Sequence, residues 1–154
     1  CALTGELHGG HSDRVLTFLN SIRAPAQVSA ACRAAQRRAG RLPGFGHALY
    51  PNGDPRAATL LALMSQMLAR NRRYVLLRAV LDEAQAPGSD PPTIDMALAA
   101  LAYVLEADNE APLAWFAIGR SAGWIAHALE QRDNGLLIRP RARYIGVQPH
   151  ARSS

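Results

Sequence analysis

The sequence contains no lysine: all 17 basic residues of the 154-residue chain are arginine. Schiff-base chemistry through a lysine amine is therefore excluded. Arginine stays charged and presents a planar fork of donors, which pairs well with carboxylate and phosphate groups. The formal net charge of +5 permits anionic ligands, nucleic acid included, but by itself selects none of them.

Cysteine is almost as scarce, since only Cys1 and Cys32 are present and no spacing resembles a metal site. This sparse use of thiols fits a reducing, cytoplasmic setting, and we expect no metal centre. No apolar run approaches the roughly 18 residues of a membrane span, and no signal peptide is visible. The chain begins without a methionine, so we expect a fragment of a longer protein.

Helical signals dominate the sequence. Between Val15 and Ile22, apolar residues recur at the spacing of one helical face. Proline, glycine and capping residues then predict helices from Pro25 to Arg38, from Asp54 to Leu68, from Asn71 onwards, from about Pro92 to Leu105, and from Asp108 or Asn109 to about Gln131. Because no segment alternates convincingly with a period of two, we predict an all-α fold.

The first cluster that could carry chemistry is His8 with Gly9 and Gly10, just before a predicted helix. Glycines beside a histidine let backbone or ligand approach closely. A histidine near a helix start can stay neutral and donate a hydrogen bond. The alternative interpretation is a turn with an incidental histidine.

The second cluster combines a glycine-rich loop with two cationic side chains. Two glycines flank an aromatic residue in the order Pro43, Gly44, Phe45, Gly46, His47. We expect these glycines to expose main-chain N–H and C=O groups that could grip a planar base. His47 and Arg56 could both reach one anion, unless the segment is only an ordinary loop between helices.

Asp95, Arg120 and Arg139 mark the remaining clusters. Asp95 lies in the predicted first turn of a helix, either because the helix dipole favours an acid there or because it is a general base. Arg120 lies in an otherwise apolar helix, where a charge needs a partner or a ligand. Arg139 begins a basic tail. The alternative interpretation is that this tail is simply a solvated basic segment.

These clusters are specific when they are taken together and in order. The chain resembles the citrate synthase family in five motifs: LHGG at 7–10, PGFGH at 43–47 followed by DPR, P-x-x-D at 92–95, GRSAGWIAHALEQ at 119–131 and RPRARYIG at 139–146. The resemblance implies an all-helical homodimer whose large and small domains close over substrate. Residues 1–106 would form the small domain, with a hinge near residue 8. Residues 107–154 would be the C-terminal segment of a large domain whose N-terminal part is absent.

The resemblance also implies a reaction and a role for each residue. An acyl-CoA such as acetyl-CoA would condense with a 2-oxo acid, oxaloacetate, to give citrate and CoA; the thioester is a substrate, and no cofactor stays bound. Asp95 would be the base, His8 the neutral donor to the thioester oxygen and His47 the donor to the ketone oxygen. The carboxylates of oxaloacetate would be bound by Arg56, Arg120 and Arg139, the last reaching into the neighbouring subunit's site. The adenine of CoA would be held by Pro43, Gly44, Phe45 and Gly46.

Four positions depart from the family pattern. Ala48 and Pro51 stand where many relatives have a basic residue for the CoA phosphates, which favours weak CoA affinity. His11 and Met96 replace a common small residue and a common aromatic, which leaves the choice between acetyl-CoA and propionyl-CoA open.

Two other readings of the sequence stay open. The chain could be a non-catalytic or truncated homologue that binds citrate or CoA, or that only assembles. An arginine-rich nucleic-acid binder rests on charge alone. Whether the chain is an enzyme or a non-catalytic homologue, the apolar faces around Trp115, Phe116 and Trp124 would lack their partner helices. Such exposed apolar faces predict an oligomer.

Overall fold

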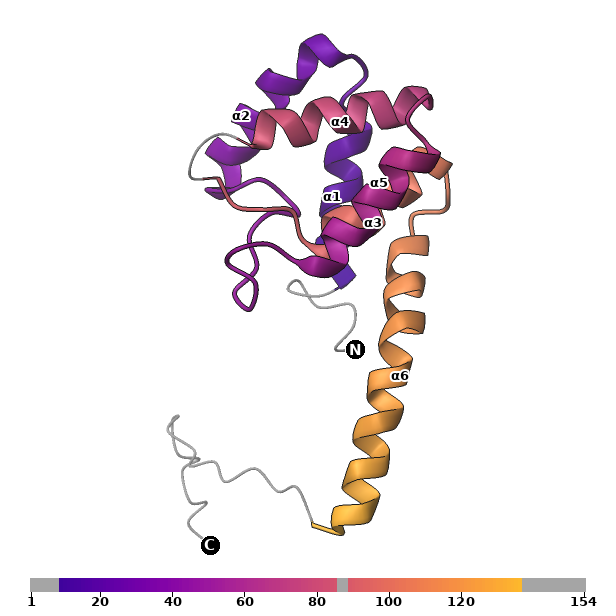
Figure 1. Cartoon of the computed structure of the whole chain (residues 1–154). Coiled ribbons are helices and arrows are strands. Elements are labelled where there is room, and N and C mark those ends of the chain that lie inside the picture. The colour runs from indigo at the N-terminus through magenta and orange to yellow at the C-terminus, as the bar shows by residue number, and fades with distance from the viewer. Residues whose placement is uncertain (1–8, 86–88, 137–154) are drawn as a thin grey trace, which may run out of the picture. The chain divides into compact units, whose positions relative to one another are not determined.

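The computed structural model describes residues 9–85 and 89–136 (Figure 1). Its elements, in chain order, are α1 (Gly9–Ser21), the short 3₁₀ helix η2 (Pro25–Gln27), α2 (Val28–Ala39), α3 (Pro55–Met67), α4 (Arg72–Ala84), α5 (Ile94–Leu105) and α6 (Ala111–Asn134). These ranges contain no strand, only an isolated antiparallel bridge between Phe45 and Pro92. The prediction of an all-α fold is confirmed.

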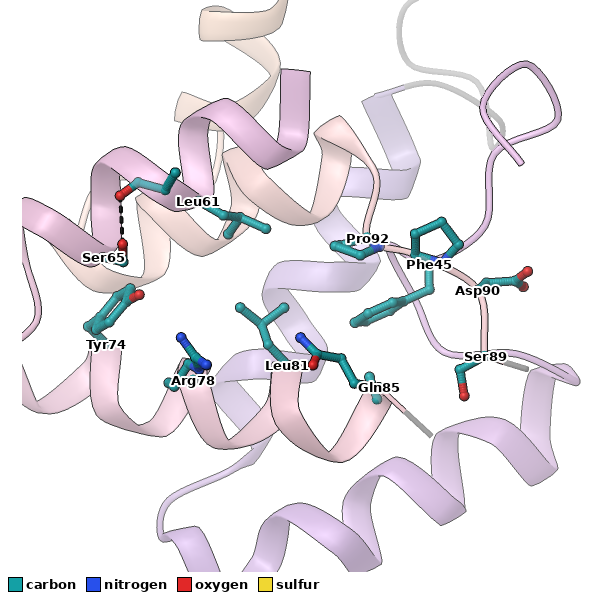
Figure 2. A pocket seen from close by; sticks show the side chains of 13 residues that line it. Phe45, Leu61, Ser65, Tyr74, Arg78, Leu81, Gln85, Ser89, Asp90 and Pro92 are labelled. Carbon is teal, nitrogen blue, oxygen red and sulfur yellow. Dashed lines mark hydrogen bonds between the residues drawn. The ribbon is translucent and has the colours of Figure 1, made fainter. Parts of the chain in front are cut away.

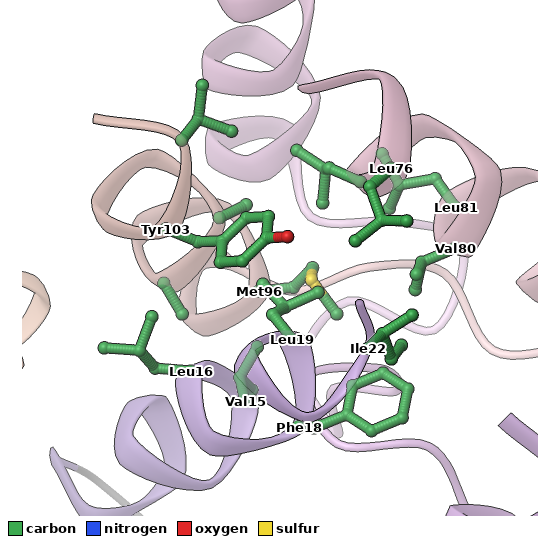
Figure 3. Packing of buried hydrophobic residues seen from close by; sticks show 14 of the residues in the cluster. Val15, Leu16, Phe18, Leu19, Ile22, Leu76, Val80, Leu81, Met96 and Tyr103 are labelled. Carbon is green, nitrogen blue, oxygen red and sulfur yellow. The ribbon is translucent and has the colours of Figure 1, made fainter. Parts of the chain in front are cut away.

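The central helix of the fold is α5. It packs against α1, α3 and α4, while α2 packs against α4. Its sequence is apolar nearly all round, as expected of a helix with neighbours on several sides. Figure 3 shows its residues Met96 and Tyr103 among buried side chains from α1 and α4. Asp95 is therefore the one acidic residue in the first turn of a mostly buried, apolar helix.

The apolar face predicted for α1 is the face that the structure buries. Val15 and Leu19 are 0% and 1% exposed, and Leu16 is buried beside them. Each such side chain contributes roughly 1.5–3 kcal/mol by leaving water. Ser12, one turn earlier on the same face, is buried as well. A buried hydroxyl requires a hydrogen-bond partner, and Ser12 finds its partner on α5.

Several helix ends lie where capping residues predict them. The Asp54 carboxylate accepts the N–H of Arg56 at 3.0 Å at the start of α3. The Asn71 side chain accepts two first-turn N–H groups of α4. Gly40 ends α2 in the left-handed region, with φ of 74°. The helix starts predicted at Asp54 and Asn71 are confirmed.

The start of α5 lies slightly further along the chain than predicted. Pro92 is not its first residue, because Pro92 takes part in the bridge to Phe45. Thr93 is extended and caps the helix, so the first helical residue is Ile94.

The bounds of α6 also shift. Ala111 donates its N–H to the Asp108 carbonyl in a turn, so α6 begins at Ala111 rather than at Asp108 or Asn109. Pro112 then occupies the first turn, where a missing N–H is tolerated. The helix continues to Asn134, beyond the predicted end near Gln131, and Gly135 terminates it with φ of 59°.

The chain divides into two compact units between Arg120 and Ser121, within α6. In the first unit, Trp115 packs against the core, so it adds less to the exposed apolar surface than predicted. In the second unit, Trp124, Ile125 and Leu129 are 41%, 61% and 46% exposed. Across the described ranges, no helix combines the length and the apolar character needed to cross a membrane.

Candidate active site

Hydrogen bonds join the loop 43–46 to the segment that leads into α5. The Gly44 carbonyl accepts the N–H of Thr93 at 2.9 Å and the hydroxyl of Thr93 at 3.0 Å. The Gly46 N–H donates to the Pro91 carbonyl at 2.9 Å. Thr93 also caps α5 by accepting the N–H of Met96. The position of the loop is thereby tied to the position of the helix start.

Much of the main chain of this loop is used inside the protein. In addition to the Gly44 carbonyl and the Gly46 N–H, the Phe45 N–H donates to the Leu42 carbonyl. The expectation that the glycines expose the main chain is wrong for these three groups, because two of them pair with the segment before α5 and the Phe45 N–H closes a turn with Leu42. The Phe45 ring is only 4% exposed. Figure 2 shows it lining a cavity of about 570 Å³ together with Leu61, Tyr74, Leu81 and Pro92.

Gly44 is needed for both its backbone angle and its lack of a side chain. Its φ of 80° lies in the left-handed region that favours glycine. A Cβ at this position would lie 2.9 Å from side-chain atoms of both Met96 and Val15. The loop thus approaches α1 and α5 more closely than a larger residue would allow.

Asp54 links the start of α3 to the start of α5 through a carboxylate that is 0% exposed. Its Oδ2 accepts the Ile94 N–H at 3.0 Å and Nη2 of Arg56 at 2.9 Å, and its Oδ1 accepts Nε of Arg56 at 2.9 Å. Burial by itself would raise the pKa of Asp54, but the hydrogen bonds from Arg56 and Ile94 hold that pKa below its ordinary value. The guanidinium of Arg56 is thereby fixed beside the first turn of α5.

Replacing Asp54 with Asn is expected to destabilise the fold by about 1.5–3 kcal/mol, because an amide N–H₂ would face groups that are themselves donors. Water still reaches Arg56, whose side chain is 45% exposed, and this limits the loss. The pKa of Asp54 is lower in the folded than in the unfolded protein, so its carboxylate stabilises the fold fully at pH values above its unfolded pKa. This stabilisation is lost as the pH falls through the pKa of the folded protein. Urea unfolding at neutral pH and at about pH 3 measures both effects.

The matched control for this variant is Asp82→Asn. Asp82 pairs with Arg78 at the same 2.9 Å, but both side chains are about half exposed. Its loss is expected to cost less than about 1 kcal/mol. Equal losses in the two variants would contradict the role given to Asp54.

Asp95 lies in the first turn of α5, as predicted. Its Oδ1 accepts the hydroxyl of Ser12 at 3.0 Å, and Ser12 is 2% exposed. His11 lies next to this pair. Burial lowers the pKa of His11, the charge of Asp95 opposes that shift, and Arg41 and Arg14 lower the pKa further. The start of α1 therefore presents a buried hydroxyl and an imidazole near the Asp95 carboxylate.

His47 and Arg56 both contact Tyr50. The ring centroids of His47 and Tyr50 are 5.1 Å apart, and the guanidinium carbon of Arg56 is 5.1 Å from the same Tyr50 centroid. Nδ1 of His47 accepts the Leu49 N–H at 3.1 Å. In the neutral imidazole the proton is then on Nε2, so His47 can donate through Nε2.

Arg120, another predicted site residue, is exposed. Its charge therefore needs no buried partner, contrary to the expectation from the apolar sequence around it. His8 and Arg139 lie outside the described residues.

Hydrogen bonding to Asp54 raises the pKa of Arg56, and the nearby charge of Asp95 adds to this rise. In the part of the chain that the structure describes, no group of three or more His, Cys, Asp or Glu side chains could hold a metal ion.

Sequence reasoning missed Ser12 and Tyr50. Ser12 does carry a signal, because it lies three, four and seven residues before Val15, Leu16 and Leu19 on the apolar face of α1. A polar residue on such a face is expected to have a buried partner. Tyr50 carries no comparable signal, since its contacts with His47 and Arg56 depend on how the loop folds.

The fold and this site together define an all-helical domain with a polar site at the first turn of its central helix. Residues 1–141 match the family model described as the citrate synthase C-terminal domain. The chain therefore belongs to the citrate synthase family, and the resemblance of its five motifs is confirmed.

Individual relatives agree with this assignment. The chain is 34% identical over 148 residues to citrate synthase 2 of Bacillus subtilis, a match that covers 94% of the chain and 40% of that protein. It is 34% identical over 152 residues to 2-methylcitrate synthase 1 of Corynebacterium glutamicum, with 96% and 39% covered. The chain thus spans about two fifths of the length of these relatives.

Solved structures match as well. The citrate synthase of Thermotoga maritima superposes with a TM-score of 0.79 at 26% identity, covering 99% of this chain and 43% of that one. The citrate synthase of Thermoplasma acidophilum, in a ternary complex with carboxymethyl coenzyme A and oxaloacetate, gives a TM-score of 0.79 at 27% identity, with 99% and 43% covered.

Proposed function

We propose that this chain supplies part of an active site that condenses an acyl-CoA with a 2-oxo acid, so that acetyl-CoA and oxaloacetate give citrate and CoA. The observation that carries the proposal is the placement of Asp95 in the first turn of a buried helix, in contact with Ser12 and near Arg56. The ligands of the Thermoplasma acidophilum relative, carboxymethyl coenzyme A and oxaloacetate, support the two substrate classes.

Asp95 is the proposed general base. Hydrogens on the carbon next to a thioester carbonyl are weakly acidic, so their removal needs a base and a donor to the oxygen. The carboxylate takes the proton, the C–H electron pair forms the C=C bond of the enol, and negative charge moves to the thioester oxygen. His8 is the proposed donor to that oxygen. The enol carbon then attacks the ketone carbon of oxaloacetate, and hydrolysis of citryl-CoA releases citrate and CoA.

The ketone and the two carboxylates of oxaloacetate are assigned to a histidine and three arginines. His47 is the proposed donor to the ketone oxygen through Nε2, which its contact with Leu49 supports. The proposed carboxylate ligands are Arg56, Arg120 and Arg139, whose planar forks suit carboxylates. Asp54 takes Nε and Nη2 of Arg56, which leaves Nη1 for the substrate.

The loop formed by Pro43, Gly44, Phe45 and Gly46 is the proposed contact for the adenine of CoA. Its contacts would come from the main-chain groups that are not bonded to the segment before α5. The CoA thioester is a substrate, and we propose no permanently bound cofactor. Because relatives named for citrate and for 2-methylcitrate synthesis both match, acetyl-CoA and propionyl-CoA are both candidate substrates.

We also propose a cytoplasmic homodimer, with residues 1–106 as the small domain and 107–154 as part of the large domain. The exposed side chains of Trp124, Ile125 and Leu129 support association, because contiguous apolar surface tends to be covered by a partner. Light scattering at micromolar concentration is expected to give the mass of two or more chains. Ile125→Asp is expected to lower that mass. A single-chain mass for the unchanged protein would contradict the proposal.

A non-catalytic or truncated homologue is the second candidate. The observation that favours it is the exposure of Arg120. Such a protein would bind citrate or CoA, or only assemble, without turnover.

Release of the CoA thiol tests the proposed function. The thiol is measured with and without oxaloacetate, for acetyl-CoA and propionyl-CoA, and the signal of Cys1 and Cys32 is subtracted. The assay is run on the chain alone and on a hybrid in which the chain replaces the matching part of the Bacillus subtilis relative. Release that requires oxaloacetate is expected. Turnover in the hybrid alone would show that the chain supplies a working part of the site but does not complete it. Turnover in neither folded form would contradict the proposal and favour the second candidate.

A further inference from the structure

We propose that Ser12 is a positioning residue for Asp95, an inference that rests on the proposed function. Ser12 Oγ donates to Asp95 Oδ1 at 3.0 Å, although the two residues are 83 positions apart in the sequence. Ser12 is 2% exposed. Because water has almost no access to this hydroxyl, solvent does not replace the contact when it is lost.

This contact separates the roles of the two carboxylate oxygens. Oδ1 is engaged by Ser12, so Oδ2 is the oxygen that takes the proton from the carbon of the thioester. A side chain whose rotation is restricted keeps Oδ2 in the orientation that proton transfer needs.

The backbone on each side of the contact is held independently. Ser12 lies within α1, the helix whose Val15 is in close contact with Gly44. Asp95 follows Ile94, whose N–H is bonded to the buried carboxylate of Asp54. The distance between Ser12 and Asp95 is therefore fixed by the backbone positions of α1, of the loop at Gly44 and of the start of α3 at Asp54, and not only by the side-chain rotamers of the two residues.

The charged groups that face Asp95 do not duplicate the role of Ser12. His11, from α1, is partly buried, and Arg41 and Arg14 act on it together with Asp95. Arg56, from α3, is bound to Asp54 through two of its nitrogens. Within residues 9–85 and 89–136, Ser12 is the side chain that donates a hydrogen bond to the Asp95 carboxylate.

Three variants test the proposal: Ser12→Ala, Ser12→Thr and, as a control on the same helix, Ser21→Ala. Ser21 donates to the Phe18 carbonyl and is exposed. Ser12→Ala is expected to lower kcat by roughly 10- to 100-fold, the cost of losing a hydrogen bond to a charged group, with KM for either substrate nearly unchanged. Ser12→Thr keeps the hydroxyl and is expected to recover most of the rate.

A merely structural role predicts a different pattern. It would lower the unfolding midpoint of Ser12→Ala but leave the kcat of the folded protein as it is in Ser21→Ala, and that result would overturn the proposal. If neither the chain nor the hybrid shows turnover, the proposed function fails, and the carboxyl-carbon NMR signal of Asp95 decides the positioning question. That signal is expected to shift in Ser12→Ala and not in Ser21→Ala; an unchanged signal would overturn the proposal on its own.

Discussion

Asp95→Asn is expected to slow the oxaloacetate-dependent release of CoA by about 10²–10⁴-fold, the usual contribution of a general base. The amide is close to the carboxylate in size and can still accept the Ser12 hydroxyl through its oxygen, so the fold should persist. It cannot take a proton from the thioester carbon, because an amide is a very weak base. Steady-state rates of CoA release, with saturating oxaloacetate, measure the effect.

The control for this variant is Asp82→Asn, which removes an equally sized charge from the exposed face of α4. Its rate should match that of the unchanged protein. Both variants must unfold at a similar urea concentration for the rates to be compared. A folded Asp95→Asn protein with full activity would show that Asp95 is an acid favoured by the helix dipole and not a base.

Gly44→Ala is expected to destabilise the fold by about 2–5 kcal/mol, the sum of backbone strain at positive φ and overpacking of a close contact. The added Cβ would lie 2.9 Å from side-chain atoms of Met96 and Val15 and 3.1 Å from the Cα of Met96. Relief of this contact has to move the loop or the first turn of α5, because Met96 is 0% exposed. Urea unfolding at neutral pH measures the loss.

Gly40→Ala separates the two causes. Gly40 has a similar φ of 74°, but no atom lies within 4 Å of the position of its Cβ. Gly40→Ala is therefore expected to destabilise the fold only through backbone strain at positive φ, by about 1–2 kcal/mol. If Gly44→Ala costs no more than Gly40→Ala, the close approach of the loop to α1 and α5 is not what determines the residue at position 44.

Local signals in the sequence were sufficient for much of the fold. The buried face of α1 follows from apolar spacing, and the starts of α3 and α4 follow from Asp54 and Asn71, because a cap involves residues only two or three positions apart. Asp95 was placed in a first turn for the same reason. The start of α5 was two residues early, since the bridge that holds Pro92 depends on Phe45, far away in the sequence.

The parts of the site that could not be predicted depend on contacts between distant segments. The hydrogen bond between Ser12 and Asp95 joins residues 83 apart, and the bond from Ile94 to Asp54 joins residues 40 apart. Capping patterns identify Asp54 as the start of a helix but give no indication that its Oδ2 accepts the Ile94 N–H at the start of α5. In the same way, the glycines of the loop 43–46 are expected from the sequence to expose the main chain, whereas pairing with the segment before α5 uses the Gly44 carbonyl and the Gly46 N–H.

Identification of the product tests the central claim most directly, because release of CoA alone does not distinguish condensation from hydrolysis of the thioester. Acetyl-CoA labelled with ¹³C in its acetyl group is incubated with oxaloacetate and the protein, and the organic acids are analysed by mass spectrometry. We predict labelled citrate in an amount equal to the CoA released, and about 10²–10⁴-fold less over the same time with Asp95→Asn. Labelled acetate in place of citrate, with oxaloacetate left unconsumed, would contradict the account.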